Sequence, residues 1–209
     1  MNLRERARIE TPKTILAGAD EVFGEEGYEG ATIAKIAERA GLSSGAVTLY
    51  FRKEDLPAAL AQEMLGRMVA AAEAASADEE ELPAAVEATV GAIYSAAAEY
   101  RDALVTINRA LELAETEAVW RARTAPLTEC IGRFVRRFQE AGQVDPRLDP
   151  AVTARVLADL IAHSVRPVVC FEDAGIAAEV VRVAQSALEW PAVGPDAPRR
   201  LTPGTRFST

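Results

Sequence analysis

Apolar residues recur at helical spacing along most of the chain. In the first such stretch they follow the i, i+4, i+7, i+8 spacing of one helix face: Ile15, Ala19, Val22 and Phe23. Glycines then break this stripe, and Gly27 is placed to cap the helix C-terminus. We expect the break to begin at Gly24. Later stripes are separated by proline or capping residues, and no segment is convincing as a strand. The pattern predicts an all-α protein of about nine helices.

Residues 31–53 contain two short helical stripes on either side of a glycine turn. Thr32 can cap the first helix, Gly41 ends it, and Ser43 or Ser44 can cap the second. Two short helices joined in this way outline a helix-turn-helix, whose second helix enters the major groove of DNA. A tight helical hairpin inside a bundle gives the same pattern.

The second of these short helices begins with small residues and has two apolar residues on one face. Val47 and Phe51 are four apart and share a face, which we expect to point inward. Gly45 lowers helix propensity by about 1 kcal/mol. That loss is understandable where the backbone must approach DNA closely.

The net charge of −9 and the pI near 4.8 argue against a nucleic-acid partner. The acidity is uneven, however: the chain has 8 Lys/Arg against 10 Asp/Glu up to Leu56, and 15 against 22 afterwards. The segment 31–53 has a local positive excess from Lys35, Arg39, Arg52 and Lys53. Since a DNA contact is made by a patch rather than by the total, the charge does not exclude DNA binding.

Composition removes several other classes of protein. Two cysteines and one histidine, His163, exclude a disulfide scaffold and a zinc finger. No apolar run approaches about 18 residues, and the charged N-terminus is unlike a signal peptide. No nucleotide-binding loop or catalytic triad spacing is present. We expect a cytoplasmic protein that has no membrane span, metal or cofactor. We also expect that it is not an enzyme; the remaining alternative is an enzyme that depends on His163 or a cysteine.

Residues 11–56, TPKTILAGADEVFGEEGYEGATIAKIAERAGLSSGAVTLYFRKEDL, resemble the N-terminal domain of the TetR family of transcriptional repressors. The resemblance implies a helix-turn-helix domain over 1–56 and a helical domain over 57–190 for ligand binding and dimerisation. The proline-rich remainder, 191–209, is expected to be a disordered tail. The implied function is a homodimeric repressor of a pseudo-palindromic operator, released by a small hydrophobic effector. The alternative is a helical small-molecule-binding or scaffold protein without DNA specificity.

The resemblance also implies which residues meet DNA. Three residues match positions that contact phosphate in the family: Thr32, Ser43 and Lys53. Three others match positions that contact the base edges or lie closest to them: Ser44, Gly45 and Ala46. Thr48 and Tyr50 occupy positions where the family commonly has tyrosine, then histidine or tyrosine. Tyr50 either contacts phosphate or packs at the helix junction. One residue, Arg52, separates Phe51 from Lys53 where the family usually has two, which should shift that junction.

Within the family, the chain resembles the γ-butyrolactone autoregulator receptors, in which a tryptophan commonly lies in the ligand pocket. Cys130 aligns with that tryptophan, which favours a pseudo-receptor that answers an antibiotic or a biosynthetic intermediate. The candidate ligand-lining residues, each of which could instead fill core, are Met64, Met68, Tyr94, Trp120, Cys130, Phe134 and His163. We expect the apolar helices at 152–171 and 176–190 to form the dimer seam.

Overall fold

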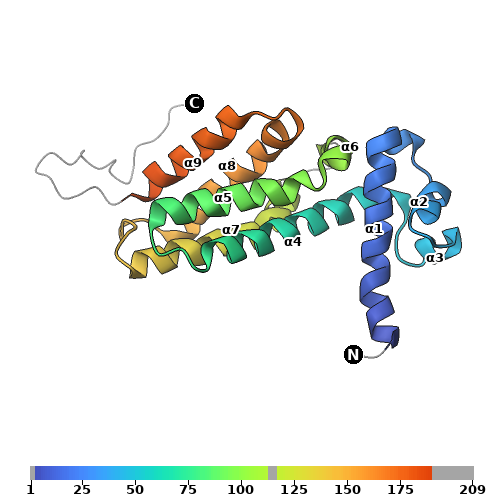
Figure 1. The fold of residues 1–209 in the computed structure, drawn as a ribbon, viewed down its shortest axis with the longest axis horizontal. Helices are drawn as coiled ribbons and strands as arrows, with labels where there is room; N and C mark the ends of the chain where they lie inside the picture. The colour runs from blue at the N-terminus through green and yellow to red at the C-terminus, as the bar shows by residue number, and fades with distance from the viewer. Residues whose placement is uncertain (1–2, 113–116, 190–209) are drawn as a thin grey trace, which may run out of the picture.

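The computed structural model describes residues 3–112 and 117–189, with side chains described within 11–107 and 119–189 (Figure 1). Over these residues the chain forms nine α-helices and no strand, which confirms the predicted all-α class. The helices are α1 (Leu3–Gly30), α2 (Ile33–Arg39), α3 (Ser44–Thr48), α4 (Leu56–Ser76), α5 (Leu82–Ala98), α6 (Arg101–Glu112), α7 (Glu117–Glu140), α8 (Pro150–Cys170) and α9 (Ala174–Leu188). A 3-10 turn, η1 (Lys53–Asp55), leads into α4. The predicted tail, 191–209, lies outside the described residues.

The helices form a small head and a larger bundle. Figure 1 shows α1, α2 and α3 at one end, with α4 running from them along α5 and α7. One buried apolar cluster fills the head around Phe23, Ile36 and Val47, and a second fills the bundle around Ile93, Leu127 and Phe138. Leu60 of α4 and Ile107 of α6 belong to the head cluster. The head is therefore packed onto the bundle through both of these helices.

The predicted helix breaks near the end of α1 are only partly right. Gly27 has φ of 68° and departs from helical geometry, so α1 is kinked at this residue rather than ended by it. The break expected at Gly24 is wrong, because α1 continues through this residue. Gly24 instead permits close packing: a Cβ there would lie 2.4 Å from the Asp102 Cβ on α6.

A poorly solvated carboxylate, Asp20, lies at the same α1–α6 contact. Its Oδ1 atom is buried and has no hydrogen-bond partner among the described residues. Burial, followed by the charges of Asp102 and Glu21, raises the Asp20 pKa from 3.8 to about 6. Between these two pH values the Asp20 carboxyl is more protonated in the folded protein than in the unfolded chain. Its contribution to the free energy of unfolding therefore falls as the pH rises from about 4 through 6.

Replacing Asp20 with asparagine should remove this penalty. At pH 7.5 we expect Asp20→Asn to raise the free energy of unfolding by about 1–2 kcal/mol, after a reduction for the partial exposure of the side chain. At pH 3.5, below both pKa values, the carboxyl is mostly protonated in both states, and the two proteins should differ much less. Urea denaturation across this pH range measures the effect. An equal loss of stability with rising pH in both proteins would assign the pH dependence to other groups.

Candidate DNA-binding surface and ligand pocket

Side-chain caps define both short helices of the head. Thr32 Oγ1 accepts a hydrogen bond from the Lys35 backbone N–H at 3.3 Å, and Ser43 Oγ accepts one from the Ala46 N–H at 3.1 Å. Of the two serines considered, the N-cap is Ser43. A hydroxyl that accepts from the backbone keeps its own proton, which it can donate to a phosphate oxygen. Both Thr32 and Ser43 are exposed and are available for this role.

The outer face of α3 is formed by small residues. Ser44 and Gly45 are exposed, Ala46 is half-buried and Val47 is completely buried on the opposite side. Phe51 packs against the head cluster from just beyond the helix. A Cβ added at Gly45 would meet only Ser43 Oγ, at 3.9 Å. At the start of α3 no long side chain covers the backbone, so a base edge could approach the backbone closely.

The helix α3 has only five residues and ends at Thr48. The Thr48 hydroxyl donates a hydrogen bond to the Gly45 carbonyl oxygen at 3.1 Å. Leu49 is 84% exposed and Tyr50 is 42% exposed, so both side chains project beside the α3 face. The sequence analysis did not single out Leu49. Its position could have been predicted, since a residue two positions after inward-facing Val47 lies on the opposite side of a helix.

The positive charge of the head is only partly free. Lys35 forms an ion pair with Glu26, and Arg39 bonds Glu21 and Glu25, each at 2.6 Å. The Arg39 hydrogen bonds lower the pKa of the Glu25 carboxyl. These pairs attach α2 to α1, so much of the local excess counted in the sequence is already neutralised.

Two basic side chains that form no ion pair in the described part of the chain lie where α3 leads into α4, directly before Glu54 and Asp55. Arg52 is exposed and, among the described residues, has no carboxylate partner. The Lys53 ammonium lies 4.7 Å from the centroid of the Tyr28 ring, a cation–π contact that holds the side chain at the end of α1. Tyr28, which the sequence analysis also did not single out, therefore positions a candidate phosphate ligand.

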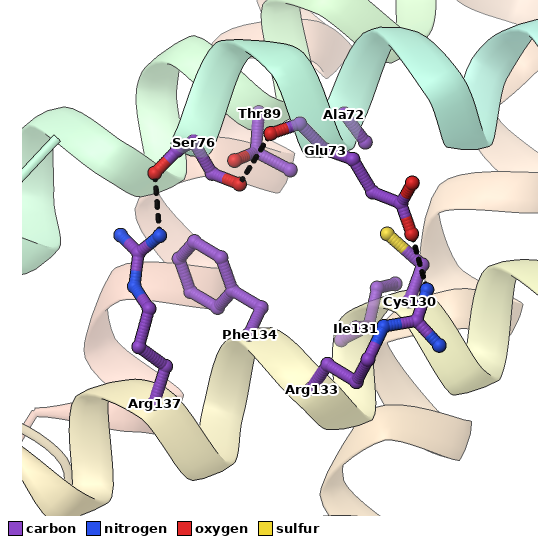
Figure 2. A pocket seen from close by; sticks show the side chains of 9 residues that line it. All are labelled: Ala72, Glu73, Ser76, Thr89, Cys130, Ile131, Arg133, Phe134 and Arg137. Carbon is purple, nitrogen blue, oxygen red and sulfur yellow. Dashed lines mark hydrogen bonds and ion pairs between the residues drawn. The ribbon is translucent and has the colours of Figure 1, made fainter. Parts of the chain in front are cut away.

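A pocket of about 200 Å³ opens between α4, α5 and α7 in the bundle (Figure 2). Its wall is formed by Ala72, Glu73, Ser76, Thr89, Cys130, Ile131, Arg133, Phe134 and Arg137. Two of the candidate ligand-lining residues, Cys130 and Phe134, meet here. Burial raises the pKa of the Cys130 thiol, which keeps it protonated and a poor nucleophile.

The other five candidate ligand-lining residues do not line this pocket. Met68 is buried in the bundle cluster, and Met64 is half-buried between the two clusters. The Tyr94 hydroxyl is hydrogen-bonded to Ser164 Oγ at 2.7 Å inside the bundle. The ring centroids of Trp120 on α7 and His163 on α8 lie 4.4 Å apart with the rings tilted by 42°, and the His163 side chain is exposed. The residues that the sequence analysis grouped together thus lie in several separate places, and only Cys130 and Phe134 line the pocket.

The arginines of α7 fasten the end of α4. Arg137 donates to the carbonyl oxygens of Ser76, the last residue of α4, and of Glu79 in the following loop, at 2.6 and 2.7 Å. Arg133 forms an ion pair with Glu73. These contacts give Arg133 and Arg137 a structural role.

Comparisons with known proteins agree with this geometry. Residues 15–60 match the family described as "Bacterial regulatory proteins, tetR family". The head is a TetR-family N-terminal domain, carried on a TetR-like fold.

Two curated relatives place the resemblance more closely. The chain is 49% identical over 55 residues to the HTH-type transcriptional repressor AcnR of Corynebacterium diphtheriae. The aligned segment is 26% of this chain and 29% of that protein. It is 26% identical over 157 residues to the A-factor receptor protein of Streptomyces griseus, 74% of this chain and 53% of that one. The match thus spans less than a third of the AcnR repressor and about half of the A-factor receptor. The first relative is named as a transcriptional repressor and the second as a receptor protein, and neither name denotes an enzyme.

Solved structures share the whole fold. One described as "Molecular basis for control of antibiotic production by a bacterial hormones" has a TM-score of 0.65 at 27% identity, covering 87% of this chain and 99% of that one. The fatty acid degradation regulator FadR from Bacillus halodurans has a TM-score of 0.67 at 24% identity, covering 85% and 94%. The likeness to FadR shows the fold alone. Within the described residues, no helix is long and apolar enough to cross a membrane.

Proposed function

We propose that the protein is a cytoplasmic transcriptional repressor that binds a pseudo-palindromic operator as a homodimer. The observation that carries the proposal is the exposed start of α3, where the side chains are short. Ser44 and Gly45 face solvent there, and Val47 is buried on the opposite side of the helix. The matched family supports the same assignment. In this proposal the start of α3 enters the major groove, and each head of the dimer occupies one half-site.

The contacts divide into two kinds in this proposal. Phosphate is held by Thr32, Ser43 and Lys53, with Tyr50 exposed beside them, and these contacts set affinity and register. Base edges lie nearest Ser44, Gly45 and Ala46, while Thr48 is held at the end of α3. Because these side chains are short, few can make bidentate base contacts. Shape and deformability of the operator then contribute to specificity.

A small hydrophobic effector bound in the helical bundle would release the operator. Support comes from the relative named as the A-factor receptor and from the structure described in terms of a bacterial hormone and antibiotic production. Butyrolactone-like signals, antibiotics and biosynthetic intermediates are the classes of effector that we propose. The Cys130 position favours the last two, since the subgroup's pocket tryptophan is absent there.

The dimer seam is proposed along α8 and α9. Val152 and Val156 on α8 are each 62% exposed and lie one turn apart, and Val183 on α9 is 40% exposed. Exposed apolar side chains on two helices in contact are typical of a surface that a partner covers.

A charge placed on this seam should separate the dimer. We expect Val156→Arg to raise the dimer dissociation constant roughly 100-fold, because an unpaired guanidinium would be buried between the copies. Analytical ultracentrifugation measures the change. Val105→Arg, at a valine 50% exposed on α6, is the matched control and should stay dimeric. A dimer of unchanged strength in Val156→Arg would place the seam elsewhere.

Selection of bound fragments from the source genome tests the function itself. The proposal predicts enrichment of a few fragments that share an inverted repeat, bound with an affinity that falls steeply as salt rises. Binding without sequence preference at physiological salt would contradict it and would favour the alternative of a ligand-binding or scaffold protein.

A further inference from the structure

The most exposed large apolar side chain in the described residues belongs to Leu49, which directly follows α3. It is 84% exposed, against 68% for Phe171 and 62% for Val152 and Val156. It belongs neither to the head cluster nor to the side chains packed against that cluster. Single apolar residues are common on protein surfaces, so exposure alone assigns no role to Leu49. Its position relative to Gly45 is the second observation.

The Leu49 side chain lies beside a part of α3 that carries none. Its backbone stays in the helical region, with φ of −69° and ψ of −25°, so Leu49 continues the face of Gly45, four residues earlier. Side chains of a helix tilt toward its N-terminus, which directs the Leu49 isobutyl group toward Gly45. Apart from neighbouring residues and the helix backbone, only Ser43 Oγ lies within 4 Å of an added Gly45 Cβ. Leu49 therefore borders a space in which a small group could lie against the backbone.

The groups around this space suit a polyanion. The exposed hydroxyls of Thr32 and Ser43 each keep a proton for a phosphate oxygen. Arg52 and Lys53, just beyond Leu49, form no ion pair in the described part of the chain. Figure 1 shows α3 on the side of the head away from the bundle. A ligand that meets both the charges and Leu49 must carry negative charge with a small apolar group beside it.

Duplex DNA meets both requirements through its phosphates and its thymine bases. Among the four bases, only thymine presents an apolar group, its C5 methyl, at the edge that faces the major groove. The exposed side chains of Ser43, Ser44 and Thr48 are short and carry hydroxyls, which pair with more than one kind of base. Leu49 forms no hydrogen bond and gains binding energy only from an apolar group. It is thus the side chain on this face that is best suited to distinguish thymine.

We propose that Leu49 is a specificity-determining residue that packs on the C5 methyl group of one thymine in each half-site. The methyl group lies beside Gly45, whose lack of a side chain leaves room for it. The inference rests on the proposed function and adds the chemistry by which one base is recognised. Each half-site then has a thymine at a fixed position that is read by its methyl group rather than by its hydrogen-bonding edge.

Replacing thymine with deoxyuridine tests this contact, because it removes the methyl group and leaves the pairing edge unchanged. Each symmetric pair of thymines in a selected operator is replaced in turn, and the affinity of the full-length protein is measured by fluorescence anisotropy. For one pair we expect affinity to fall about 15-fold, or about 4-fold for each methyl group that is no longer buried.

Two variants assign the effect to Leu49. Leu49→Ala should weaken binding of the unmodified operator by a similar factor and abolish the effect of deoxyuridine at that pair. Effects at the other thymine pairs should be equal in both proteins, which makes them the internal control. Leu49→Met keeps a long apolar side chain and should keep the sensitivity. Because Leu49 packs on neither described cluster, Leu49→Ala should leave the free energy of unfolding unchanged, which separates a DNA contact from a structural role.

The failure of this contact and the failure of the proposed function give different results. Selective operator binding with no pair sensitive to deoxyuridine would overturn the role of Leu49 and leave the repressor function standing. The same conclusion follows if Leu49→Ala keeps the sensitivity. It also follows if Leu49→Ala binds the unmodified operator as tightly as the natural protein, the result expected if Leu49 contacts a partner protein instead. A protein that selects no operator would overturn both the function and the contact.

Discussion

Gly45→Leu is expected to abolish sequence-specific DNA binding without disturbing the fold. A Cβ at this position meets only Ser43 Oγ, at 3.9 Å, and the exchange of glycine for leucine favours the helix by up to about 1 kcal/mol. The added isobutyl group, however, would stand on the exposed start of α3, where the proposed docking brings the backbone against a base pair. We expect operator affinity to fall about 1,000-fold or more, to the non-specific level.

Gly91→Leu is the matched control. Gly91 on α5 is also exposed, with no atom near the position of an added Cβ. This variant should keep operator affinity and gain similar helix stability. Affinity is measured by fluorescence anisotropy on a selected operator, and circular dichroism confirms that each variant is folded. Specific binding that survives Gly45→Leu would mean that α3 is not the element that enters the groove.

The second large effect is expected where the head meets the bundle. Gly24→Ala introduces a Cβ that would lie 2.4 Å from the Asp102 Cβ and 3.2 Å from the Asp102 carbonyl carbon. Because these atoms cannot swing away as the end of a side chain can, α1 and α6 must separate. We expect the free energy of unfolding to fall by about 2 kcal/mol, within the range for overpacked contacts. Urea denaturation provides the measurement.

Two further variants separate this contact from helix propensity. Gly91→Ala makes the same exchange in open space and should stabilise the protein by about 0.5–1 kcal/mol. Asp102→Gly removes the atom that clashes, so a double-mutant cycle with Gly24→Ala should show a coupling that restores part of the loss. A destabilising effect of the same size with and without the Asp102 Cβ would show that the α1–α6 contact is not its cause.

Features of the head could be predicted from the sequence because they depend on neighbouring residues. A cap at Thr32 or Ser43 needs only an N–H three residues later, and Gly27 and Gly41 mark positions with positive φ. The small face of α3 follows from helical spacing once Val47 is assigned inward.

Features that depend on packing between distant segments could not be predicted in the same way. The local count of charge overestimated the free positive patch, because Arg39 pairs with glutamates 14 and 18 residues earlier. Gly24 looked like a helix breaker because nothing in its neighbourhood shows that α6 approaches there. The pocket joins α4 to a segment of α7 about 60 residues later, so Glu73 and Arg133 could not be paired from spacing alone.

The most direct test of the central claim is the ratio of dissociation constants for a selected operator and a scrambled duplex of equal composition, at physiological salt. The account predicts a ratio of about 1,000 or more for the natural protein, because base and shape readout add to the phosphate contacts. It also predicts that Gly45→Leu brings this ratio close to one. A natural protein that binds both duplexes equally, or neither of them, would contradict the assignment of the head as a sequence-specific DNA-binding domain.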